Sequence, residues 1–299
     1  AIASAFGLAS ALSVIVLGDE SGYEVGEVQQ VKLAAVEAEW ETQVPPASFT
    51  LFGIPNEETQ RTDYALKIPA VLGLMATRSV SEEVKGLQQI KEENLQRIIR
   101  GQEAYDLMQR IRAGDKSSAT VDRFNEVRVD LGFGLLLSGY TDDVLNATPE
   151  EIANAVEATV PKVWPLFWSF RVMVACGFLM LLLFACAFWH SARRTVDKPK
   201  WLLKFAVFSL PLPWIASEMG WFVAEYGRQP WAIGEILPTH LAVSQLSPGD
   251  VLFTLISIAV LYSIFVIIEI WLMTKYARKG PSSLHTGRYD LETAEAQEA

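Results

Sequence analysis

Two carboxylates and two indoles share one helical face of a strongly apolar segment. The intervals between successive members are four, three and four residues, which places all of them on one stripe of a helix. They are Trp214, Glu218, Trp221 and Glu225. Ionisable side chains at membrane depth are costly, and such positions are commonly functional. Glu225 then has three interpretations: a proton-relay acid, an ion-pair partner of Arg228 three residues later, or a metal ligand.

A second apolar segment carries Arg171 and Met173 near its start. A guanidinium stays charged in a membrane and requires an anion, which a carboxylate or a cofactor such as a haem propionate can supply. A thioether is a usual axial ligand of low-spin haem iron, although a single methionine more often only fills a core. Glu218 and Glu269 are weaker candidates for an intramembrane role. Glu269 lies near a helix end, from which its side chain can reach the membrane surface.

Lys32 and Glu37 lie in a more polar stretch, five residues apart. On a helix this spacing separates them by about 140°, so no salt bridge between them is expected. Without further information, each is most simply a solvated charge. The spacing of the three histidines does not predict a metal site; they are His190, His240 and His285.

The charge of the chain is unevenly distributed. The chain has 299 residues, 51% of them hydrophobic, and a formal net charge of −10. Residues 19–163 hold 25 acidic and 14 basic side chains, a net of −11, whereas the remainder holds 10 acidic and 11 basic ones, a net of +1. This pattern indicates an acidic, water-exposed insert in a membrane protein. It argues against nucleic-acid binding, which requires a basic surface.

Four apolar runs predict an all-α, polytopic membrane protein with four transmembrane helices and a large, mostly helical extracytoplasmic insert. Two prolines, Pro211 and Pro213, should kink the third run. The predicted order is a transmembrane helix at 1–18, the insert at 19–163, helices at 164–190 and 201–226, an outer loop at 227–249, a helix at 250–276 and a tail at 277–299.

Basic residues predict the orientation of these helices. Residues 191–200 carry four Lys or Arg residues, and three more follow the last apolar run, whereas 227–249 carries only Arg228. By the positive-inside rule, the tail is cytoplasmic and the insert extracytoplasmic. Since the first run starts without a Met and is slightly short for a bilayer, we expect the chain to begin within a helix, with further residues upstream.

Within the insert, apolar residues recur with helical spacing between about Glu83 and Arg112, and again from Val121 to Leu131. A further helix should begin at Thr148, because Thr-Pro-Glu-Glu is a capping box with proline at the first helical position.

Several stretches together resemble subunit I of the cytochrome bd ubiquinol oxidases, along essentially the whole chain. The most specific is Trp221-Phe-Val-Ala-Glu-Tyr-Gly-Arg-Gln-Pro-Trp231. The others are Gly18-Asp-Glu-Ser-Gly-Tyr-Glu24, Lys32-Leu-Ala-Ala-Val-Glu-Ala-Glu-Trp-Glu41, Phe170-Arg-Val-Met-Val-Ala-Cys-Gly177 and Gly287-Arg-Tyr289. The resemblance is to the carboxyl-terminal portion of that subunit, in the form with a long quinol loop.

The resemblance implies a function in respiration. The family, in the bacterial inner membrane, passes electrons from quinol to oxygen, which is reduced to water, and contributes to the proton gradient. It uses two b-type haems and one haem d. The resemblance implies that residues 19–163 form the extracytoplasmic quinol-binding loop, and that Lys32 and Glu37 take part in quinol oxidation.

The resemblance also implies which residues surround the haems. Met173 matches an axial ligand of the low-spin b haem, with Arg171 beside it. Glu225 matches the axial ligand of the high-spin b haem, and Trp221 and Arg228 match its neighbours.

The family's histidine ligands lie in upstream helices that have no counterpart in this sequence. We therefore expect this chain to need those helices of subunit I, besides the smaller subunit II and the lipid bilayer, before it can reduce oxygen. Two alternatives remain from the residues alone. One is a membrane sensor or solute receptor with an extracytoplasmic helical domain, and the other is a proton-coupled transporter, for which no inverted repeat is visible.

Overall fold

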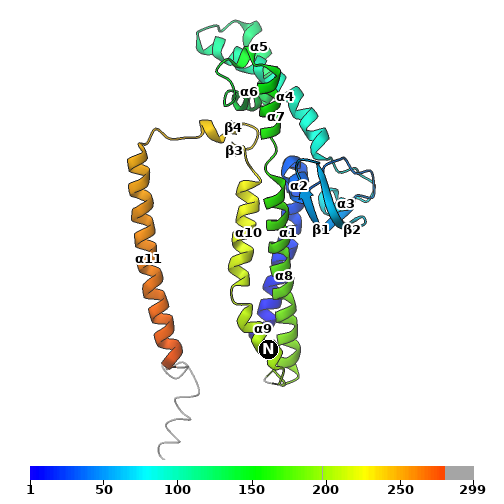
Figure 1. Ribbon diagram of the computed structural model, residues 1–299, viewed down its shortest axis with the longest axis vertical. Helices are drawn as coiled ribbons and strands as arrows, with labels where there is room; N and C mark the ends of the chain where they lie inside the picture. The colour runs from blue at the N-terminus through cyan, green and yellow to red at the C-terminus, as the bar shows by residue number, and fades with distance from the viewer. Residues whose placement is uncertain (197, 280–299) are drawn as a thin grey trace, which may run out of the picture. The chain divides into compact units, whose positions relative to one another are not determined.

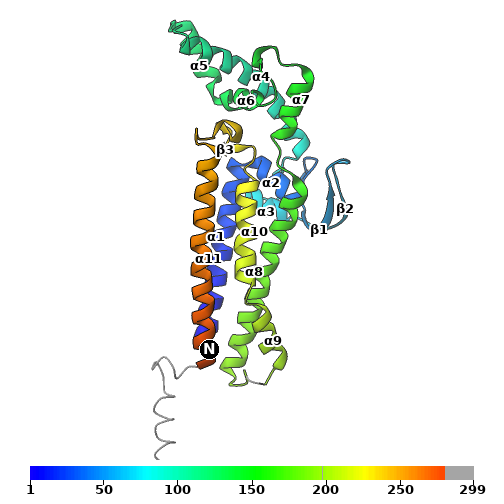
Figure 2. The same cartoon turned by 60° about the vertical axis from the view of Figure 1, so that its left-hand side comes forward.

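The long helix α8 (Val163–Ala192) is the centre of the membrane-embedded part of the first structural unit. It packs along α1 (Ile2–Val28) on one side and α10 (Leu212–Tyr226) on another, and Figures 1 and 2 both show the three side by side. The computed structural model describes residues 1–196 and 198–279. It contains two compact units, Ala1–Ala242 and Val243–Ala299. The second unit holds α11 (Pro248–Lys279).

Four helical spans are long and apolar enough to cross a membrane, which confirms the predicted fold class. They are Ile2–Val28, Pro149–Ala192, Lys200–Tyr226 and Pro248–Arg278. The predicted kink is also confirmed, because the third span divides into α9 (Lys200–Phe208) and α10, with Pro211 as the N-cap of α10.

The first helix differs from the predicted boundary at residue 18. It continues to Val28, although the apolar run has ended. Arg78 explains part of this extension, because its guanidinium contacts Asp19 at 2.6 Å and Glu20 at 3.1 Å. Arg78 therefore holds the acidic turn of α1 that follows the apolar run. The tail beyond Lys279 lies outside the described residues.

The first part of the insert folds against the upper end of α8. Its elements are α2 (Gln30–Glu37), β1 (Phe49–Asn56), β2 (Arg61–Ile68) and α3 (Val71–Thr77). The antiparallel hairpin β1–β2 is not anticipated by the sequence. Register shifts after Thr50 and Phe52 disturb the alternation of side chains by which a strand is recognised.

The second part of the insert is a helical group, shown at the top of Figure 1. It contains α4 (Leu87–Arg112), α5 (Ser118–Val127), η1 (Arg128–Asp130), α6 (Leu131–Leu137), η2 (Val144–Asn146) and α7 (Pro149–Ala158). The predicted capping box at Thr148 is present. Helices α4 and α6 touch through their glycines, since a Cβ at Gly134 would lie 2.1 Å from the carbonyl oxygen of Gly101.

The segment after α10 is clamped onto this helical group. It forms a short hairpin, β3 (Trp231–Ile233) and β4 (Leu237–Pro238), followed by η3 (Thr239–Leu241). Trp231 is buried and meets Phe133 edge to face, with ring centroids 5.2 Å apart. Arg97 of α4 joins buried Asp130 to Glu235 of the hairpin, with both contacts at 2.8 Å.

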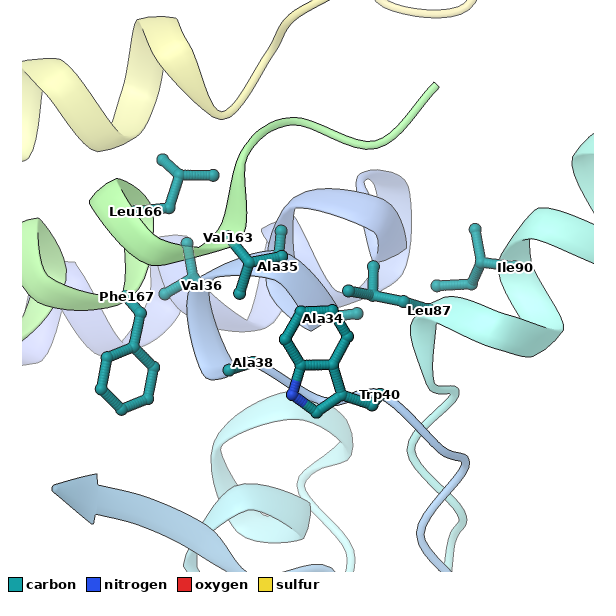
Figure 3. Packing of buried hydrophobic residues seen from close by; sticks show 10 residues of the cluster. All are labelled: Ala34, Ala35, Val36, Ala38, Trp40, Leu87, Ile90, Val163, Leu166 and Phe167. Carbon is teal, nitrogen blue, oxygen red and sulfur yellow. The ribbon is translucent and has the colours of Figure 1, made fainter. Parts of the chain in front are cut away.

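The core nearest to the candidate site brings α2, the start of α4 and the start of α8 together (Figure 3). Small residues of α2, Ala34 and Ala35, allow close approach, and Leu166 and Phe167 of α8 are fully buried beside them. Trp40 closes the cluster, and its indole N–H donates to the Thr62 hydroxyl at 3.0 Å. This packing fixes α2 against the membrane helix.

Candidate functional site

A buried ion pair joins the insert to α8. The guanidinium of Arg171 donates from Nη2 to Oε2 of Glu37 at 2.9 Å, and the two side chains are only 8% and 2% exposed. From the sequence, the anion beside Arg171 could be either a carboxylate side chain or a cofactor. The structure supplies a carboxylate, from a residue 134 positions away in the chain.

Burial raises the pKa of Glu37 to about 6, against the opposing effects of the Arg171 charge and hydrogen bond. Burial thus disfavours the charged form of Glu37, and the contact with Arg171 favours it. The expectation that Glu37 is a solvated charge is wrong, because its side chain is buried where α2 packs on α8.

Lys32 points to a different place from Glu37, as the angle of about 140° between them predicts. Its aliphatic stem packs on Gly227, where an added Cβ would lie 2.9 Å from Cγ of the lysine. Burial lowers the pKa of Lys32, the nearby charge of Arg228 lowers it further, and Glu225 opposes both. The insert thus places a half-buried lysine beside the end of α10.

Glu225 and Arg228 form an ion pair at the end of α10, which is one of the three interpretations given by the sequence. Their side chains remain 46% and 41% exposed. The rest of the predicted stripe is also uncovered in the described part of the chain: Trp221 is 64% and Trp214 69% exposed, and Glu218 is exposed too. The stripe therefore faces away from α8.

Met173 faces α10 rather than the insert. An added Cβ at Gly220 would lie 3.0 Å from its sulfur. Met173 and Arg171 are two residues apart, which separates them by about 200° around the helix. The structure therefore pairs Arg171 with Glu37, and Lys32 with the segment containing Glu225, while the Met173 sulfur lies between α8 and α10.

A cavity of about 710 Å³ opens beside Lys32. Residues from α2, from α4 and from the segment after α10 line it, among them Asn94, Arg97, Arg228 and Glu235. Its wall combines polar and apolar groups, which suits an aromatic ring that carries hydroxyl groups.

The donor set fits a metal held in a macrocycle. Within the described residues there is no group of three or more His, Cys, Asp or Glu side chains able to hold an ion by itself. A haem would bring four nitrogen ligands of its own and would need only one or two groups from the protein. A thioether is a usual one, and carboxylate oxygens also bind iron in proteins. Met173 and Glu225 offer these two groups on neighbouring helices.

Several residues of this region carry no signal in the sequence. Thr50 contributes only its backbone carbonyl, and Glu39 is a buried acid in a stretch that reads as polar. Glu57 caps the start of α8 by accepting from the backbone N–H of Val163 at 3.0 Å. Each depends on a contact between segments far apart in the chain.

Comparison with known proteins identifies the family of the chain. The family model for cytochrome bd terminal oxidase subunit I matches residues 1–281. The chain belongs to this family. It is 46% identical over 286 residues to cytochrome bd-II ubiquinol oxidase subunit 1 of Escherichia coli (strain K12), covering 96% of this chain and 56% of that protein. It is 25% identical over 291 residues to cytochrome bd ubiquinol oxidase subunit 1 of Bacillus subtilis (strain 168), covering 97% and 50%.

The chain spans about half the length of the curated relatives it matches. Membership of the cytochrome bd subunit I family, together with the four apolar spans, indicates a bacterial inner-membrane protein. The receptor and transporter alternatives find no support in these comparisons.

Proposed function

We propose that this chain forms the quinol-oxidising and haem-ligating part of subunit I in a cytochrome bd quinol:oxygen oxidoreductase. The observation that carries the proposal is the buried contact between Glu37 of the insert and Arg171 of α8, two residues from Met173. It connects the segment that resembles a quinol loop directly to the helix that bears a candidate haem ligand. The family match supports the same activity.

Quinol oxidation releases two electrons and two protons. Lys32 would bind and orient a quinol hydroxyl in the adjoining cavity, and Glu37 would hold α2 and its lysine at the membrane helix. We place residues 19–163 and 227–249 outside the cytoplasm and the tail inside, as the basic residues indicate. The protons of quinol would then be released outside.

For the haems, we propose Met173 as axial ligand of the low-spin b haem and Glu225 as axial ligand of the high-spin b haem. Trp221 would lie against the second macrocycle, and Arg228 would balance charge beside it. When bound, the haems, two of type b and one haem d, would supply one-electron transfer and the reduction of oxygen. The remaining helices of subunit I would complete their sites, and subunit II would be the partner in the membrane.

The test uses the intact oxidase in membranes. Lys32→Ala and Glu37→Gln should each slow ubiquinol oxidation at least tenfold, while haem content stays constant. Lys116→Ala, an exposed residue of the same insert, is the control and should leave the rate unchanged. Unimpaired quinol oxidation in both variants would refute the proposed site, and loss of all haem would show that the two residues are structural.

A further inference from the structure

Arg171 has every one of its hydrogen-bond donors occupied by the protein. A guanidinium has five N–H groups. Nε donates to the carbonyl of Thr50 at 3.1 Å, and Nη1 donates to the carbonyls of Val36 and Phe167 at 2.9 and 3.1 Å. Nη2 donates to Glu37 and to the Thr50 carbonyl.

The guanidinium also lies over two aromatic rings. Its central carbon lies 3.3 Å from the ring centroid of Phe167 and 5.4 Å from that of Phe49. Stacking on aromatic rings adds to the attraction of a desolvated cation. Arg171 is therefore enclosed by α8, the end of α2 and the start of β1, and no N–H remains for a further anion.

Two irregular points of the insert backbone present carbonyl groups to Arg171. Helix α2 ends at Glu37, and its C-cap residue Ala38 is left-handed, with φ of 52°. Arg171 donates to the Val36 carbonyl in the last turn of α2, where a cation is favourable. The register shift after Thr50 interrupts the ladder of β1 and β2, where the Thr50 carbonyl accepts two bonds from Arg171.

From this geometry we infer that Arg171 is a positioning residue, which anchors the insert at residues 36–50 to the helix of Met173. The inference rests on the proposed function, since the anchored segment is the one proposed to bind quinol. The resemblance places Arg171 beside the haem, and its contacts in the structure add this role in the insert. Because Arg171 and Met173 point in different directions from α8, the two residues should be separable by mutation.

Hydrogen exchange of the intact oxidase in detergent separates them. Arg171→Lys keeps the charge but offers only three donors on one nitrogen, so it cannot reach all four acceptors. Backbone amides of residues 34–52 should exchange at least tenfold faster, while those of α6 serve as an internal reference. Met173→Leu is the matched control, which removes the candidate ligand two residues away and should leave exchange at 34–52 unchanged.

Either of two results in these variants would overturn the inference. One is unchanged exchange at 34–52 in Arg171→Lys. The other is an equal increase in Met173→Leu, which would mean that the haem holds the insert. If Arg171→Lys does not assemble, Glu37→Gln retains a neutral acceptor and should give a smaller increase, of about threefold, and no increase would refute the anchor. Exchange is independent of turnover, so failure of the proposed quinol chemistry would not be confused with failure of the anchor.

Discussion

The most quantitative prediction concerns Glu39, a buried acid just past the end of α2. Its side chain is 6% exposed, and burial raises its pKa to about 7. Lys67 and a 2.6 Å hydrogen bond from Gln43 oppose the shift, whereas Glu37 and Glu41 add to it. In the unfolded chain the pKa is near 4.5, so folding favours the protonated acid.

The sign of the pH dependence follows. Because the folded-state pKa is raised, the stability contributed by protonated Glu39 is complete below pH 4.5 and is lost as pH rises through 7. Between pH 5 and pH 8 this loss amounts to at most about 2 to 3 kcal/mol, or up to about a hundredfold in a local opening equilibrium. Glu39→Gln mimics the protonated form and should abolish this part of the slope.

The assay is exchange of the Leu87 amide, which donates to the backbone carbonyl of Glu39 at 2.8 Å. Protection is measured at pH 5 and pH 8 and corrected for the intrinsic pH dependence of exchange. The wild type should lose far more protection than Glu39→Gln, while the contribution of Glu37 is common to both proteins. Equal losses in the two proteins would refute the protonated, buried state of Glu39.

Three further substitutions test the packing of the insert by thermal unfolding. Asp130→Asn weakens a buried acceptor of two arginines and should destabilise the insert by about 2 kcal/mol, and an unchanged transition would contradict the clamp. Gly134→Ala should also lower the unfolding midpoint, because its Cβ would meet the Gly101 carbonyl. Gly234→Ala is the control and should leave the midpoint unchanged, because nothing lies within 4 Å of its added Cβ. Equal midpoints in the two variants would refute the close contact. Thr148→Ala removes the capping box and should cost about 1 kcal/mol, unless tertiary contacts alone fix the start of α7.

The sequence predicts the elements whose signals are local. Hydropathy predicts the four spans, proline the break before α10, and the Thr148 box the start of α7. Contacts between distant segments have no such signal. The spacing of Lys32 and Glu37 correctly separates the two side chains, but it cannot indicate that Glu37 meets Arg171, because that contact depends on how α2 packs on α8. The bulged strand that presents the Thr50 carbonyl is hidden for the same reason.

For the stripe of Trp214, Glu218, Trp221 and Glu225, the sequence predicts the shared helical face but not the partners of its side chains. Helical spacing predicts that its members share one face, and the structure shows that this face points away from α8. The sequence left the ion pair with Arg228 open, and the structure contains it. Ligation of iron by Glu225 stays a prediction.

The most direct test of the central claim is the reduced-minus-oxidised absorption spectrum of the intact oxidase carrying Met173→Leu. Met180→Leu, on the same helix seven residues later, is the matched control. The low-spin b haem band should disappear in Met173→Leu and persist in Met180→Leu. An unchanged low-spin band in Met173→Leu would contradict the assignment of Met173 as a haem ligand.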